Sequence, residues 1–142
     1  MKIRSKVLLL FFFGALLCSC AKDDYEPSVQ WFKFNCRNTQ RSFNVDFSLR
    51  ISVTYKDETL PVMLEILSPS GIRYRDTLNI PVKKQVSDGL TTVVRSGVWR
   101  DVLWHYRKNV SFPLTGRWLF TIYYLEPGTK KGKIKEFKLK IQ

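Results

Sequence analysis

Apolar and polar residues alternate along much of the chain. The longest alternation covers thirteen residues, 43–55, in which every odd-numbered residue is apolar and every even-numbered residue is polar. A period of two is typical of a strand with one buried face and one wet face. The unusual length of this strand predicts a bend or a bulge partway along it. We therefore expect Phe47, Leu49 and Ile51 in the core, and Asp46, Ser48 and Arg50 in water.

Shorter segments with the same alternation follow, separated by turn signals. Residues 56–58 predict one turn, and Ser68-Pro69-Ser70-Gly71 predicts a tighter one, because Pro and Gly favour chain reversals. The segment 60–66 is expected to be a second strand, antiparallel to 43–55. Further strands are expected at 31–34, 72–80, 110–114, 118–124 and 137–141.

Two segments depart from this pattern. Residues 83–97 are polar and weakly patterned, which predicts a long loop. Val98, Val102, Leu103 and Tyr106 have helix-like spacing, which allows one short helix over 99–106. The remaining strands number about seven, and each must cover its apolar face against a second layer. The sequence therefore predicts an all-β fold, an antiparallel β-sandwich of the immunoglobulin-like kind.

The first twenty residues predict export and lipid attachment. Three cations precede an apolar run, 7–17, that is too short for a membrane-spanning helix. Leu17 and Ser19 before Cys20 resemble a bacterial lipobox, in which the chain is cut before a lipidated cysteine. Cys18 fits this pattern less well, because the large Leu17 would then lie next to the cut. We expect Cys20 to carry acyl chains such as palmitate that anchor the protein to a membrane. The alternative is an ordinary secretory signal with an incidental cysteine.

These assignments divide the chain into a lipoprotein signal peptide (1–19), a lipidated tether (20–27) and one β-sandwich domain (28–142). The mature protein is expected in the cell envelope, held on the inner or the outer membrane by its lipid. Beyond the anchor it would face the periplasm or the cell surface. No transmembrane helix is needed for this attachment.

The chain is strongly basic, with a formal net charge of +12, and three of its cations but no acid lie in the signal peptide, which leaves about +9. A basic surface in the envelope faces anionic glycans and lipid headgroups. Nucleic acid is the usual partner of basic proteins. We exclude it, because an envelope lipoprotein rarely meets it and the cations are spread along the chain. Their local concentration within 130–140 is expected to be the solvated face of a strand.

The sequence offers little catalytic chemistry. Cys36 is the only cysteine left once the leader is cut and Cys20 is lipidated, so neither an internal disulfide nor a zinc cluster can form. We expect Cys36 to be a buried thiol. The single histidine, His105, lies in an aromatic stretch, and the carboxylates fall on different segments. We therefore expect no enzyme activity, no cofactor and no metal. A hydrolase built from carboxylates on distant strands is the weaker alternative.

Aromatic residues crowd the second half of the chain, with arginines among them. Trp, Tyr and Arg are enriched at the energetic centres of protein interfaces. Many of these aromatic side chains are expected to fill the core. Trp99, Arg100 and Trp104 lie outside the clean strand alternation, so we expect them to be exposed and to contact a protein partner in the envelope.

Several segments together resemble a known family. They are the lipobox, Leu60–Ile66 with the turn 68–71, Asp76-Thr77-Leu78, Asp101-Val102, the segment 106–110, and the aromatic strand 116–123 that opens with Gly. In these the chain resembles the type H gliding motility lipoproteins of Bacteroidetes. Lys22-Asp23-Asp24 also resembles a signal that sends some lipoproteins of these bacteria to the outer-membrane surface.

The family implies a membrane-anchored accessory protein of gliding, with no catalytic residues to carry over. We thus expect a non-enzymatic component of a gliding-motility or associated secretion assembly, acting within an envelope protein complex. The alternative is a surface lipoprotein that binds glycan or lipopolysaccharide.

Overall fold

The computed structural model describes residues 29–142, apart from 84–88, 127–128 and 130–131. These residues form eight β-strands and, within the described part, no helix. The strands are β1 (Val29–Cys36), β2 (Ser42–Ser52), β3 (Thr59–Leu67), β4 (Arg73–Pro81), β5 (Thr91–Ser96), β6 (Trp99–Ser111), β7 (Gly116–Tyr124) and β8 (Ile134–Ile141). A helix long and apolar enough to cross a membrane is not found among the described residues.

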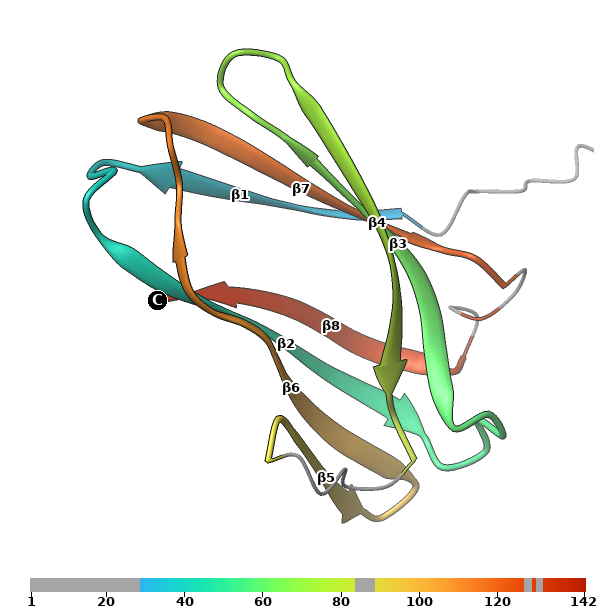
Figure 1. Ribbon diagram of the computed structural model, residues 1–142. Helices are drawn as coiled ribbons and strands as arrows, with labels where there is room; N and C mark the ends of the chain where they lie inside the picture. Colours follow the sequence, from blue (N-terminus) through green and yellow to red (C-terminus); the bar gives the residue numbers. More distant parts are fainter. Residues whose placement is uncertain (1–28, 84–88, 127–128, 130–131) are drawn as a thin grey trace, which may run out of the picture.

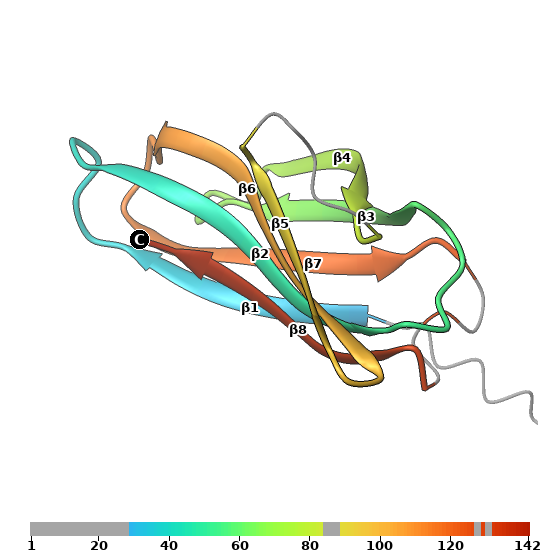
Figure 2. The same cartoon turned by 90° about the horizontal axis from the view of Figure 1, so that it is seen from below.

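The strands form two four-stranded antiparallel sheets packed face to face (Figure 1, Figure 2). Sheet A has the strand order β1-β7-β3-β4, and sheet B has the order β5-β6-β2-β8. The core between them includes the fully buried side chains of Phe47, Ile51, Leu60, Phe120 and Ile122. The predicted antiparallel β-sandwich is confirmed, with eight strands where about seven were expected.

The first and last strands lie in different sheets from those they would occupy in an immunoglobulin domain. In that fold the first strand lies in the same sheet as the second, and the last strand lies in the same sheet as the one before it. Here β1 pairs with β7 in sheet A, and β8 pairs with β2 in sheet B. The two terminal strands therefore lie at the same side of the sandwich in opposite sheets, where they contact each other.

β2 and β3 do not pair with each other, contrary to the expectation for the segments 43–55 and 60–66. β2 pairs with β6 and β8, whereas β3 pairs with β4 and β7. The connection between them carries the chain from sheet B to sheet A, and Tyr55 within it is buried. The alternation predicts which face of a strand is buried. It does not predict which sheet the strand joins, because strands of both sheets bury one face in the same core.

The segment 99–106 belongs to β6, so the short helix predicted there is wrong. Arg100 and Val102 point to the core, whereas Leu103 between Val102 and Trp104 is exposed. Leu103 and Val98 are apolar but exposed. Counted together with the buried Val102, they gave the apolar residues of this segment the spacing of a helix.

The other differences between the predicted and the observed strands are smaller. β5 lies within 83–97, which was predicted as a loop and of which 84–88 lie outside the described residues. Val110 belongs to β6 and not to a separate strand, and the buried Phe112 lies in the β6–β7 connection. The remaining predicted strands, 31–34, 72–80, 118–124 and 137–141, correspond to β1, β4, β7 and β8.

The alternation along β2 has two exceptions, because the polar residues Asp46 and Ser52 are buried. Phe47, Leu49 and Ile51 are buried as predicted, and the expected irregularity appears as register shifts against β6 between Phe43 and Asp46. Asp46 is only 4% exposed, so its assignment to water is wrong. Its Oδ1 lies 2.7 Å from Nδ1 of His105 on β6, and this neighbour satisfies the buried carboxylate.

Candidate functional site

Cys20 and Cys36 differ in what is known of their surroundings. Cys20 lies outside the described residues, as do the predicted signal peptide and tether, so lipid attachment stays a prediction. Cys36 ends β1, is a free thiol and is buried, as predicted.

Arg100 is a buried residue, contrary to the exposure predicted for it, with only 7% of its surface exposed. Its Nη2 donates hydrogen bonds to the carbonyl oxygens of Ser52 at 3.1 Å and Tyr55 at 2.9 Å. Burial lowers the pKa of the Arg100 guanidinium below its usual value. These bonds hold the connection that crosses from sheet B to sheet A, which gives Arg100 a structural task.

The two tryptophans predicted to accompany Arg100 point to opposite faces of sheet B. The ring of Trp104 stacks on the buried Phe47, with ring centroids 5.9 Å apart, and contacts Tyr106. Trp99 lies under the ammonium of Lys135, whose Nζ is 5.5 Å from the ring centroid. The three predicted contact residues therefore do not form one surface, and only Trp99 lies on the outer face.

The pair of Asp46 and His105 is the arrangement closest to catalytic chemistry. An aspartate bonded to Nδ1 is the orienting half of a catalytic triad, which also needs a nucleophile at the other ring nitrogen. No hydrogen bond joins the His105 ring to a Ser, Thr or Cys side chain among the contacts of the described residues. The described residues also hold no group of three His, Cys, Asp or Glu side chains that could bind a metal ion.

The outer face of sheet A carries a group of apolar side chains around the central strand β7. Cross-strand pairing aligns Trp31 of β1 with Thr121 of β7, and Thr121 with Glu65 of β3. Leu119 and Tyr123 flank Thr121 on the same face of the central strand. We call this surface the Trp31 face; it consists of Val29, Trp31, Met63, Leu67, Leu119, Thr121 and Tyr123.

The exposure of this face is what makes it a candidate site. The outer face of an antiparallel sheet is normally polar where it meets water. Trp31 is nonetheless 60% exposed, and the other members of the Trp31 face are half-buried by one another. A contiguous apolar surface of this kind commonly marks an interaction site.

One buried acid, Glu65, lies within the Trp31 face between Met63 and Leu67, and cations surround it. Glu65 is 5% exposed and accepts hydrogen bonds from Arg73 Nη1 at 3.2 Å and from Arg75 Nε at 2.7 Å. The Nζ of Lys33 lies 4.9 Å from the ring centroid of Trp31, a cation–π distance.

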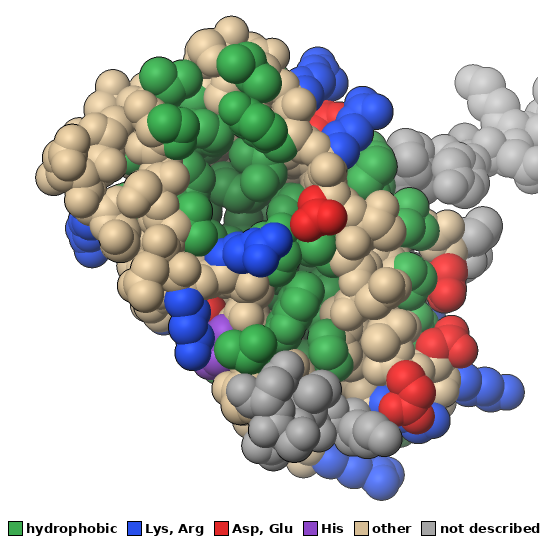
Figure 3. Space-filling model, in the orientation of Figure 1, with side chains coloured by type: hydrophobic (Ala, Val, Ile, Leu, Met, Phe, Trp, Pro, Cys, Tyr) green, Lys and Arg blue, Asp and Glu red, His purple; other side chains and the backbone are tan. Residues whose placement is uncertain are grey.

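A second apolar region lies on the side of the molecule that Figure 3 shows. There hydrophobic side chains gather in a hollow between the two sheets. Tyr106 of β6 spans the gap and donates a hydrogen bond from its hydroxyl to Asp76 of β4 at 3.0 Å. Burial, together with this bond to the carboxylate, raises the pKa of Tyr106. This bridge joins the two sheets, so the hollow has a structural role and the Trp31 face is the stronger candidate site.

The sequence contains a signal for the Trp31 face that the alternation alone concealed. In β7 the residues Trp118, Phe120 and Ile122 fill the core, while Leu119 and Tyr123 on the opposite face of the strand are also apolar. A strand that is apolar on both faces is expected only where both faces are covered. At the centre of a sheet, such a strand indicates that the outer face of the sheet is covered as well as the inner face.

No protein-family model matches the chain, and comparisons with curated proteins and with solved structures find no match. The assignment of a function therefore rests on the residues and the geometry of the described strands.

Proposed function

We propose that this protein is a membrane-anchored lipoprotein of the cell envelope that works without catalysis, as a docking component of a gliding-motility or associated secretion assembly. The observation that carries the proposal is the Trp31 face, an apolar surface on the solvent side of the central strands β7 and β3. The resemblance of the turn 68–71 and of the segment 106–110 to gliding lipoproteins supports the choice of assembly.

The lipid anchor would keep this face close to the membrane. Nine residue steps separate Cys20 from Val29, the first residue of β1. A fully extended chain gains about 3.5 Å per residue, so the tether reaches roughly 30 Å at most. Trp31 follows two residues later on the edge strand, so a partner in or on the same membrane can reach it.

The docking face is tested by charge insertion on matched leucines. Leu119 lies on the outer face of sheet A, and Leu103 lies on the outer face of sheet B, on β6, the strand that also carries Trp99. A strain lacking the gene should lose gliding or secretion of a motility-associated protein. We expect the parent chain and the Leu103→Lys variant to restore it, and Leu119→Lys to fail while remaining folded and membrane-bound. Restoration by Leu119→Lys, with failure of Leu103→Lys, would return the docking site to the surface around Trp99.

A glycan- or lipopolysaccharide-binding role is the second candidate, favoured by one specific arrangement. The exposed indole of Trp31 can stack on a sugar ring, and the neighbouring Lys33 carries a charge that suits phosphates and acidic sugars. Direct binding of purified lipopolysaccharide to the parent, reduced in a Trp31→Ala variant, would favour this role. The lipopolysaccharide-binding role would be favoured over protein docking if the Trp31→Ala variant also kept every protein partner of the parent.

A further inference from the structure

The two sheets end in four edge strands, β1, β4, β5 and β8. Exposed edges invite pairing with another chain, and natural proteins protect them with charges, prolines or short strands. Three of these edges carry such protection: Arg73, Arg75 and Pro81 on β4, Lys135, Lys138 and Lys140 on β8, and a length of six residues in β5. β1 is the exception.

The sequence of β1 is typical of a strand that pairs on both sides. It reads VQWFKFNC, with Lys33 as its only charge. All eight residues pair with β7 without a register shift, so no bulge bends the strand away from a neighbour. In the described part of the chain, β1 has β7 on one side and no strand on the other. A straight, largely apolar edge of this length, with one charge, is a candidate site for pairing with another chain.

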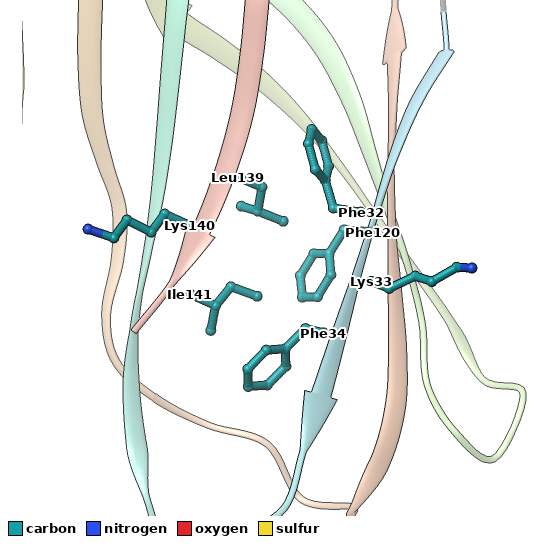
Figure 4. A pocket seen from close by; sticks show the side chains of 7 residues that line it. All are labelled: Phe32, Lys33, Phe34, Phe120, Leu139, Lys140 and Ile141. Atoms are coloured by element: carbon teal, nitrogen blue, oxygen red, sulfur yellow. The ribbon is translucent and has the colours of Figure 1, made fainter.

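The space beside the free edge of β1 is apolar. A cavity of about 290 Å³ lies between β1 and β8, lined by Phe32, Lys33, Phe34, Phe120, Leu139, Lys140 and Ile141. Figure 4 shows the apolar side chains facing one another across this space, while Lys33 and Lys140 point away from it in opposite directions. The two cations therefore do not close the cavity, and they do not converge on a charged ligand inside it.

We propose that β1 pairs in an antiparallel manner with β1 of a second copy of this chain. The pairing joins the two sheets A into one continuous sheet across a twofold axis. A twofold interface uses the same surface of both copies, which a single unprotected edge provides. Phe32 of each copy then lies opposite Phe32 of the partner subunit.

The register follows from the residues of β1. Side chains directly opposite each other in an antiparallel pair lie on the same face, so the axis must pass through a residue position. The two positions nearest the middle of β1 are Phe32 and Lys33. An axis at Lys33 would place like charges opposite each other, which is destabilising.

An axis at Phe32 makes two favourable contacts. Trp31 of each copy lies opposite the partner subunit's Lys33, which repeats between the copies the cation–π contact that Lys33 makes within one chain. The two Phe32 rings form an aromatic pair at the centre. The two Trp31 faces then become one continuous surface. This self-association does not depend on which partner the surface docks.

Sedimentation equilibrium of a chain that begins at Ala21 tests the proposal, because residues 29–142 hold every described strand and the core. The parent should form dimers as its concentration rises. Trp31→Lys places two lysines opposite each other on each side of the central Phe32 pair and should weaken dimerisation about tenfold or more. Adding Lys33→Glu to that variant should restore the dimer, because the lysine introduced at position 31 then faces the glutamate introduced at position 33 of the other copy. Thr77→Lys, on the outer face of the opposite edge strand β4, should have no effect.

Disulfide trapping provides an independent measurement of the register. A mixture of Trp31→Cys and Lys33→Cys chains should form a cross-linked dimer under mild oxidation, and each variant alone should cross-link far less. Cys36 is buried and does not compete. A parent that stays monomeric at every concentration overturns the proposal. Equal dimerisation of Trp31→Lys and its parent, or cross-linking of Lys33→Cys with itself, overturns the register.

Discussion

Arg50 and Asp101 lie directly opposite each other on β2 and β6, on the outer face of sheet B. Arg50 donates two hydrogen bonds to the carboxylate, from Nε at 2.6 Å and from Nη2 at 2.8 Å. This two-pronged geometry is the strongest that an arginine and a carboxylate form. The hydrogen bond and charge of Arg50 hold the pKa of Asp101 below its usual value.

This ion pair predicts how stability depends on pH. Because the pKa of Asp101 is lower in the folded protein than in the unfolded chain, its contribution is complete above the usual pKa of 3.8. The contribution is lost as the pH falls below that value towards the folded pKa. An Asp101→Asn variant should therefore be less stable than the parent in denaturant melts at neutral pH, and the difference should shrink in acid. The pair is largely exposed, so we expect a small effect. A difference that does not change with pH would contradict this account.

The buried face of β2 predicts a contrast between adjacent residues. Leu49 is buried in the core, whereas Ser48 is half-buried on the outer face. Leu49→Ala should lower the free energy of unfolding by about 2–5 kcal/mol, because it leaves a cavity. Ser48→Ala should change it by about 0.5 kcal/mol or less. Denaturant melts of both variants provide the comparison, and equal effects would mean that the register of β2 is wrong.

Glu65 and its two arginines predict that removing the two cations lowers stability more than removing the acid. Removing Arg73 and Arg75 together leaves a buried carboxylate without its donors, a loss of about 1–3 kcal/mol. Glu65→Leu removes the buried charge and leaves two arginines that water can hydrate. We therefore expect the double variant Arg73→Ala with Arg75→Ala to be less stable than Glu65→Leu. The opposite order in thermal melts would show that Glu65 is hydrated and not held by the arginines.

Cys20 predicts a defined processing phenotype. The parent should incorporate radioactive palmitate and fractionate with membranes, because the lipid forms the anchor. Cys20→Ala should abolish the label and yield an unprocessed or soluble chain. Continued labelling of that variant would move the modification to Cys18.

The alternation of side chains was sufficient to predict the class of the fold and the buried face of β2. It failed at β6, where exposed apolar residues such as Leu103 imitate a helical stripe. It also failed at Asp46, because a polar residue can be buried when its partner, His105, comes from a strand about sixty residues away. Periodicity describes one strand at a time, whereas these outcomes depend on which strands are neighbours.

The candidate site was harder to predict for the same reason. Trp31, Leu119 and Met63 lie far apart in the sequence and form one surface only through the order β1-β7-β3. Trp99, Arg100 and Trp104 are close in the sequence, but a strand sends Arg100 and Trp104 inward and Trp99 outward. Composition predicted a contact surface at Trp99, Arg100 and Trp104, whereas the pairing of strands divides these residues between two faces and exposes Trp31 on another sheet.

The central claim is that the Trp31 face docks a protein of the envelope, and photo-crosslinking in living cells tests it most directly. A photoreactive amino acid is placed at Leu119 on sheet A and, in a matched strain, at Leu103 on sheet B. Illumination should join the chain carrying the probe at 119 to a motility or secretion protein, and the probe at 103 should give no such product. A protein adduct from position 103 alone, or lipopolysaccharide as the only adduct at 119, would contradict the claim.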